Sequence, residues 1–172
     1  MPDYEVRPAT LRDAKAIAEV HVASARAAYA GILPEDQLSA WRPPRARPSG
    51  ARPSSSASRR CTWPCWARRW PASSGFDRSR DPKTPSTTGE IWALYVKPEH
   101  WGKGVGVALW DAARDGLDEE GCTVVTVWVP LRNDRALRFY ELAGFKREMK
   151  TAKTTSLGGT KIEEIRLKRN VA

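Results

Sequence analysis

The stretch ALYVKPEHWGKGVGVAL, residues 93–109, joins a strand-like start to a glycine-rich turn and a helix-like end. Its first residues are apolar or aromatic, and Pro98 then interrupts the extended pattern. Gly102, Gly104 and Gly106 follow just before an apolar run with helical spacing. Glycines let the backbone approach a ligand closely, and a helix N-terminus supplies N–H groups and partial positive charge. The stretch therefore predicts an anion-binding loop.

Two other phosphate-binding motifs do not fit this loop. A Walker loop requires Lys and then Ser or Thr after its last glycine, whereas Val107 and Ala108 follow Gly106. A dinucleotide fingerprint would require a glycine at position 107 or a small residue at position 109, where Val and Leu stand. The loop is therefore of another kind, and Lys103 adds a mobile cation to it. A glycine-rich turn without a ligand is the plainer alternative.

Strands and helices alternate along the rest of the chain. Apolar alternation and β-branched content predict strands over residues 4–9, 89–96, 122–129, 145–150 and 161–168, with a turn at 155–160 between the last two. Helical spacing predicts helices over residues 11–29, 105–119 and 133–143, with a short one opening at 34–35. This order predicts an α/β fold with a mixed sheet, in a single domain over residues 1–172.

The loop WGKGVG, residues 101–106, resembles the pyrophosphate loop of the GNAT superfamily of N-acetyltransferases, whose usual form is [Q/R]-x-x-G-x-[G/A]. Trp101 stands where the family usually has Gln or Arg. The run NDRALRFYELAGF, residues 133–145, resembles the family's N-x-x-A-x-x-F-Y-x-x-x-G-F. The resemblance covers residues 4–40 and 86–170, and it fails over 41–80.

The resemblance implies a GNAT-type mixed, mostly antiparallel sheet flanked by helices, and an acetyl-CoA-dependent N-acetyltransferase. The amine would attack the thioester directly in a ternary complex, so neither a cysteine nucleophile nor a metal is expected. The backbone of Leu94, Tyr95 and Val96 would bind the pantetheine arm. The diphosphate would lie on the loop residues Trp101, Gly102, Lys103, Gly104, Val105 and Gly106. Asn133 would hydrogen-bond the cofactor or a water, or would simply cap its helix.

The resemblance also suggests catalytic residues. Tyr140 lies where the family keeps its general acid, and a phenol with a pKa of about 10 is protonated at neutral pH. Glu90 begins the cofactor strand and could take the amine proton, directly or through water. Tyr29 lies in the part that roofs the acceptor site in this family. The alternatives are a core aromatic for Tyr140, a solvated strand-end carboxylate for Glu90, and plain packing for Tyr29.

Residues 41–80 differ from both flanks in composition. They hold ten arginines and one aspartate but no Leu, Ile, Val, Met, Lys or Glu. The rest of the chain carries 19 basic and 19 acidic residues, so this segment supplies the whole formal net charge of +9. A basic nucleic-acid-binding arm, a natural linker and a misread reading frame are the three explanations.

A shifted reading frame explains the segment best. Trp and Cys codons begin with TG, so joining the last base of each preceding codon to these two bases gives Leu, Val or Met. In that frame residues 60–71 become mostly apolar around a glycine, as a strand, a turn and a second strand would require. We therefore hypothesise that about residues 42–78 are translated out of frame, which sequencing of the source gene would test. The chain as printed lacks the residues for a hairpin there, so region 41–80 is expected to be irregular.

The composition of the chain also indicates its cellular location and its class of partner. No apolar run is long enough to span a bilayer, and the N-terminus is too polar for a signal peptide, so the cytoplasm is expected. The expected partner is a small-molecule or peptide amine, with no membrane, with nucleic acid disfavoured, and with a homodimer as an option. Two other function classes stay open: a degenerate acyl-CoA-binding protein, and a nucleic-acid binder that uses the Arg-rich segment.

Overall fold

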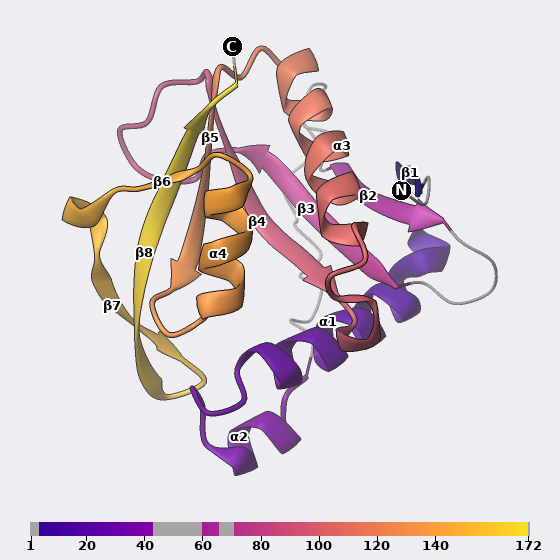
Figure 1. The fold of residues 1–172 in the computed structure, drawn as a ribbon, viewed down its shortest axis with the longest axis vertical. Coiled ribbons are helices and arrows are strands. Elements are labelled where there is room, and N and C mark those ends of the chain that lie inside the picture. Colours follow the sequence, from indigo (N-terminus) through magenta and orange to yellow (C-terminus); the bar gives the residue numbers. More distant parts are fainter. Residues whose placement is uncertain (1–3, 43–59, 66–70, 172) are drawn as a thin grey trace.

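The computed structural model describes residues 4–42, 60–65 and 71–171, which form one twisted sheet with helices packed against it (Figure 1). The strands are β1 (Glu5–Pro8), β2 (Arg60–Cys65), β3 (Ala72–Arg78), β4 (Thr88–Val96), β5 (Val124–Pro130), β6 (Lys146–Arg147), β7 (Lys153–Leu157) and β8 (Thr160–Asn170). The α-helices are α1 (Ala14–Ala28), α2 (Glu35–Ser39), α3 (Val105–Glu119) and α4 (Asp134–Leu142). Short 3₁₀ turns are η1 (Leu11–Asp13), η2 (Pro98–His100) and η3 (Met149–Thr151).

The sheet has the strand order β1-β2-β3-β4-β5-β8-β6, and β7 also pairs with β8. Strands β4 and β5 are parallel, whereas the other described pairs are antiparallel. This arrangement confirms the predicted mixed, mostly antiparallel sheet flanked by helices.

Strands β4 and β5 pair over only part of their length. Their paired residues run from Thr88 with Val124 to Ile91 with Val127, although the strands continue to Val96 and Pro130. On the other side of β4, the register to β3 shifts so that Trp92 has no partner. Such a bulge bends a strand away from its neighbour. Beyond Ile91 the two strands are therefore no longer paired in the described ladder, and this gap between the β4 and β5 backbones is called the slot below.

The main core lies between the sheet and helices α3 and α4, which cover one face of it in Figure 1. Alternate residues of β5 and β8 point into this core, as the two-residue period of a strand requires. Buried members include Ile91, Val125, Val127, Val129, Leu117, Leu137, Ile165 and Leu167. On β4, Leu94 packs toward this core, whereas its neighbour Tyr95 contacts His21 of α1 on the opposite face.

The expectation of an irregular region over 41–80 is wrong where the structure describes it. Strand β2 pairs with both β1 and β3, and β3 pairs with β4 over Ala72–Arg78. Backbone hydrogen bonding does not require apolar side chains, and small residues fit here because the Trp92 ring covers Gly75. Residues 43–59 and 66–70 lie outside the described part, so the frame hypothesis for about 42–78 stays a prediction.

The C-terminal hairpin also differs from its prediction. Residues 155–157, expected in a turn, belong to β7 and pair with 160–162 of β8. The turn consists of Gly158 and Gly159 alone, both with positive φ, which suits a two-residue hairpin loop. The strand predicted over 145–150 is reduced to Lys146–Arg147, followed by η3.

Asp13 joins β1 to the start of α1. Its carboxylate accepts hydrogen bonds from Nη1 and Nη2 of Arg7 at 3.0 and 2.9 Å, and from the backbone N of Thr10 at 2.7 Å. The Arg7 bonds, and then the Thr10 bond, hold the pKa of Asp13 well below its usual range, although burial acts in the opposite direction. The ionised carboxylate therefore favours the folded chain.

Asp13→Asn is expected to lower the free energy of unfolding at neutral pH, because the amide offers Arg7 no charged acceptor. A carboxyl with a lower pKa in the folded chain stabilises it above the unfolded pKa of about 3.9, and this contribution fades as the pH falls toward the folded pKa. Urea denaturation of both proteins at neutral pH and at about pH 3 measures it. If the two proteins differed in unfolding free energy by the same amount at both pH values, the ionised Asp13 carboxylate would not be the source of the stabilisation.

Candidate active site

The loop between β4 and α3 has the backbone that its glycines suggest. Gly102 and Gly104 have φ values of 70° and 85°, in the left-handed region that glycine adopts without strain. Gly104 is also the N-cap of α3. The first amides of a helix have no acceptor within the helix, so those after Gly104 can bind an anion. The exposed Lys103 adds a cation beside them.

Trp101, which stands at the family's usual Gln or Arg position, fixes this loop to the end of β4. Its indole Nε1 donates to the carbonyl oxygen of Val96 at 2.7 Å, and the Arg135 guanidinium lies 4.1 Å from the ring centre. Tyr4 adds a second tether, because its hydroxyl donates to the carbonyl oxygen of Lys103 at 2.8 Å. No local pattern in the sequence signals this role of Tyr4, because its partner lies 99 residues away.

The predicted cofactor residues of β4 lie beyond the end of its pairing with β5. Leu94, Tyr95 and Val96 pair with β3, so their backbone is fixed on one side. Toward β5 they have no strand partner in the described ladder, which leaves that side for hydrogen bonds to a ligand, although the carbonyl oxygen of Val96 already accepts one from Trp101. The side chain of Val105 is fully buried, so any contact of this residue with a ligand comes from its backbone.

Tyr140 lies on α4 in the core beside this slot and is 6% exposed. The centres of the Phe139 and Phe145 rings are 5.1 and 5.3 Å from the Tyr140 ring centre. Burial, and then the nearby Tyr95, raise the pKa of the Tyr140 hydroxyl well above its ordinary value. The hydroxyl is therefore protonated at neutral pH, as a proton donor must be.

A cluster of rings lies on the opposite face of β4. Tyr95 packs against His21 with ring centres 4.3 Å apart, and Tyr29 stacks on Trp41 at 5.7 Å. Burial, and then Tyr29, raise the pKa of Tyr95 to about 12, whereas burial lowers the pKa of His21. Tyr29 thus acts electrostatically on Tyr95, and Tyr95 acts in the same way on Tyr140. Trp41 was missed because it opens the segment with the unusual composition.

Glu90 is not the solvated strand-end carboxylate of the plainer alternative, because it is 4% exposed. Its Oε2 accepts from the backbone N of Arg80 at 2.9 Å, and its Oε1 accepts from Arg80 Nη2 at 3.0 Å. Glu90 directly precedes Ile91, the last β4 residue paired with β5. Its side chain lies on the opposite face of the sheet from Ile91 and from the core that contains Tyr140. The two predicted catalytic groups are therefore on opposite faces of the sheet, with the slot between them.

Asn133 caps α4, and its Oδ1 accepts from the backbone N of Ala136 at 3.2 Å. This contact supports the helix-cap alternative for its side chain. In the described part of the chain, no set of three or more His, Cys, Asp or Glu side chains is arranged to bind a metal. No helix within the same residues is both long and apolar enough to cross a membrane.

Residues 65–145, which include the slot, the glycine loop and the whole second motif, match the model of the acetyltransferase (GNAT) family. The chain carries a GNAT-family domain. The mycothiol acetyltransferase of Kocuria rhizophila is 41% identical to it over 59 residues, which are 34% of this chain and 20% of that relative. An uncharacterised N-acetyltransferase of Methanocaldococcus jannaschii is 34% identical over 59 residues, which are 34% of this chain and 26% of that protein. The match thus spans only a minor part of either relative.

Solved GNAT structures share the fold over nearly the whole chain. The PaiA N-acetyltransferase of Thermoplasma acidophilum, in complex with coenzyme A, superposes with a TM-score of 0.73 at 21% identity and covers 98% of this chain and 99% of that one. The YncA protein of Salmonella typhimurium, with its cofactor acetyl-CoA, gives a TM-score of 0.67 at 17% identity over 98% of this chain and 94% of that one. At these identities the likeness concerns the fold.

Proposed function

We propose that this GNAT domain is an acetyl-CoA-dependent N-acetyltransferase that acts on a primary amine. The observation that carries the proposal is the slot between β4 and β5, which runs into the glycine loop at the N-terminus of α3 with a protonated Tyr140 beside it. The names of the sequence relatives point the same way.

The residues of the slot and loop fit acetyl-CoA, which would supply an activated acetyl thioester. The open side of the β4 backbone at Leu94–Val96 suits the amide groups of the pantetheine arm. The loop amides after Gly104 and the exposed Lys103 suit the diphosphate. Trp101 acts by holding this loop, in place of the side-chain contact that Gln or Arg would make. Asn133 contributes by fixing the start of α4.

Transfer requires two proton movements. The amine nitrogen attacks the thioester carbon, the carbon–sulfur bond breaks, and the thiolate leaves. Tyr140 donates its hydroxyl proton to that sulfur. Glu90 accepts the proton lost by the amine, directly or through a water, because each of its oxygens keeps a further lone pair beside its bond from Arg80.

Glu90→Gln is expected to lower kcat/KM by about 10²-fold, because the amide cannot accept the amine proton. The release of free CoA thiol at saturating acetyl-CoA measures the rate. Glu141→Gln is the matched control, because Glu141 is 43% exposed on α4 and pairs only with Arg147 among the described residues. Equal rates for both variants would remove Glu90 from the mechanism.

The acceptor is proposed to be a small molecule or a peptide N-terminus that enters on the face of Tyr29 and Tyr95. Their rings, together with Trp41 and His21, give that face an apolar wall. Thermal melting with acetyl-CoA comes first, and a saturable rise in Tm would demonstrate binding. A panel of primary amines in the thiol-release assay then identifies the acceptor. Absence of any Tm rise would contradict the proposed function.

A second candidate function is an acyl-CoA-binding protein without turnover. The two hydrogen bonds from Arg80 favour it, because they occupy the carboxylate that would act as base. A rise in Tm with acetyl-CoA, but no thiol release with any amine in the panel, would select this function.

A further inference from the structure

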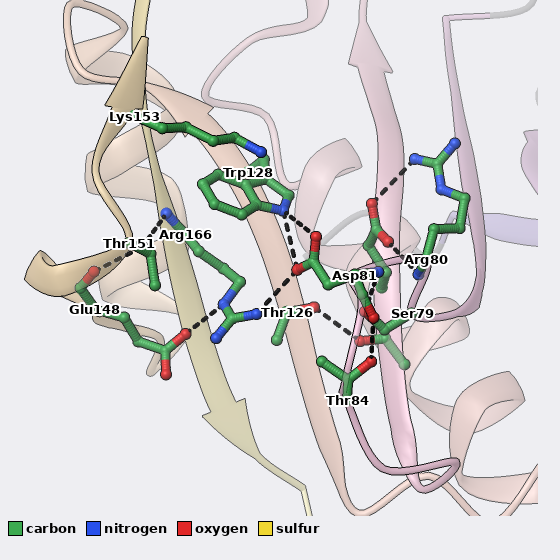
Figure 2. A network of polar contacts seen from close by, with 12 residues as sticks. Ser79, Arg80, Asp81, Thr84, Thr126, Trp128, Glu148, Thr151, Lys153 and Arg166 are labelled. Carbon is green, nitrogen blue, oxygen red and sulfur yellow. Dashed lines mark hydrogen bonds and ion pairs between the residues drawn. The ribbon is translucent and has the colours of Figure 1, made fainter. Parts of the chain in front are cut away.

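The loop between β3 and β4 places two neighbouring side chains on different strands. Arg80 binds Glu90 of β4, and Asp81 binds residues of β5 and β8. Figure 2 shows the two side chains pointing away from each other, with Asp81 directed toward Trp128 and Arg166. One short piece of loop therefore connects three strands of the sheet.

The Asp81 side of this connection is well packed. Its Oδ1 and Oδ2 each lie 3.1 Å from the Trp128 indole Nε1, and Oδ2 accepts from Arg166 Nη1 at 2.9 Å. The side chains of Asp81 and Arg166 are only 17% and 20% exposed. Glu148 accepts from Arg166 Nε at 2.5 Å, and Lys153 Nζ lies 3.6 Å from the Trp128 ring centre.

The Arg80 side is anchored differently. The Arg80 side chain is 70% exposed, so its ion pair with Glu90 contributes little by itself. The backbone N–H of Arg80 also donates to Glu90, and this bond depends on where the loop lies. Ser79 Oγ accepts from the Asp81 N–H at 3.2 Å, and Thr84 Oγ1 donates to the Asp81 carbonyl at 2.8 Å. Asp81 is therefore the main anchor of the loop.

These contacts lie where the β4–β5 ladder stops. Glu90 comes just before the last paired residue of β4, Ile91, and Trp128 comes just after the last paired residue of β5, Val127. The side chains of Glu90 and Trp128 lie on the sheet face opposite the main core. The loop thus bridges β4 to β5 and β8 at the start of the slot.

We propose that Arg80 and Asp81 form a staple that sets the width of the slot between β4 and β5. The two residues are positioning residues: they touch neither the cofactor nor the acceptor, and they act through Glu90 and Trp128. The inference rests on the proposed function, because it assumes that the slot holds the pantetheine arm. A slot held at a fixed width presents the β4 backbone to that arm without further ordering.

Asp81→Ala is expected to weaken acetyl-CoA binding on the order of tenfold, because small displacements of positioning groups have large effects on binding and rate. Asp81→Asn keeps an oxygen for the Trp128 indole but loses the charge, so its Kd should fall between those of Asp81→Ala and the wild type. Asp13→Ala is the matched control, because it also removes a well-buried aspartate paired with an arginine, away from the slot. It should lose Tm but keep the wild-type Kd.

Hydrogen exchange of the free protein gives a readout without the cofactor. Amides of residues 92–96 and 128–130 should exchange faster in Asp81→Asn than in the wild type, and in Asp13→Ala they should not. Unchanged exchange together with an unchanged Kd in both Asp81 variants would overturn the staple. Failure of the wild type to bind acetyl-CoA would instead overturn the proposed function, and exchange alone would then decide whether the staple exists.

Discussion

Tyr140→Phe is expected to lower kcat by about 10²–10³-fold while the Kd for acetyl-CoA stays unchanged. The substitution removes only the hydroxyl that would protonate the leaving thiolate. The remaining ring keeps its contacts with Phe139 and Phe145, so the Tm should change little. On the same preparation, thiol release measures kcat, titration with acetyl-CoA measures the Kd, and thermal melting measures the Tm.

The pH dependence gives an internal check on this role. Burial, and then Tyr95, raise the pKa of Tyr140, so its acid form persists at alkaline pH where an exposed tyrosine would have ionised. The wild-type rate should therefore not decline through the ordinary tyrosine range near about pH 10 on account of this group. An unchanged kcat in Tyr140→Phe would mean that solvent protonates the thiolate, and Tyr140 would then be a core aromatic.

The sequence allowed the elements around the two motifs to be predicted because they are defined by local signals. The predicted helix 105–119 is α3 itself, and Asn133 caps α4, which was one of its two predicted roles. Gly102 and Gly104, which the sequence places in the loop before α3, both have the positive φ that glycine adopts without strain. A glycine or a cap acts within a few residues of itself, so one sequence suffices to place it.

The contacts that surround Glu90 could not be predicted in this way. Arg80 binds the predicted base, but it is one of ten arginines in residues 41–80, and nothing in their composition distinguishes it from the others. Asp81 meets Arg166 across 85 residues, and no periodicity in the sequence signals such a partner. Strand β3 was missed because Ser73, Ser74 and Gly75 show no alternation of apolar residues, although all three are buried. The pattern of apolar residues in a sequence indicates which face of a strand or helix is buried. Which side chains then contact each other depends on the register between strands, which that pattern does not give.

Gly104→Ala is expected to have the largest effect on cofactor affinity. Gly104 has a φ of 85° at the N-cap of α3, and a side chain in this region costs about 1–2 kcal/mol. The backbone can relieve that strain only by rotating, which would turn the next amides away from a bound diphosphate. One lost hydrogen bond to a charged group is worth about 1.5–3 kcal/mol, so the Kd for acetyl-CoA should rise roughly 10- to 150-fold.

Gly121→Ala separates this effect from simple destabilisation. Gly121 follows the other end of α3 with a φ of 75°, and an added Cβ there would meet nothing within 4 Å. At Gly104 the nearest atom to an added Cβ is Tyr4 Cε2 at 3.7 Å, an ordinary contact. The two variants should therefore lose similar amounts of unfolding free energy, measured in urea, while only Gly104→Ala loses affinity. The two variants strain the backbone at opposite ends of α3, and only Gly104 lies beside the proposed diphosphate site. Equal Kd values for both variants would therefore mean that the first turn of α3 does not bind the diphosphate.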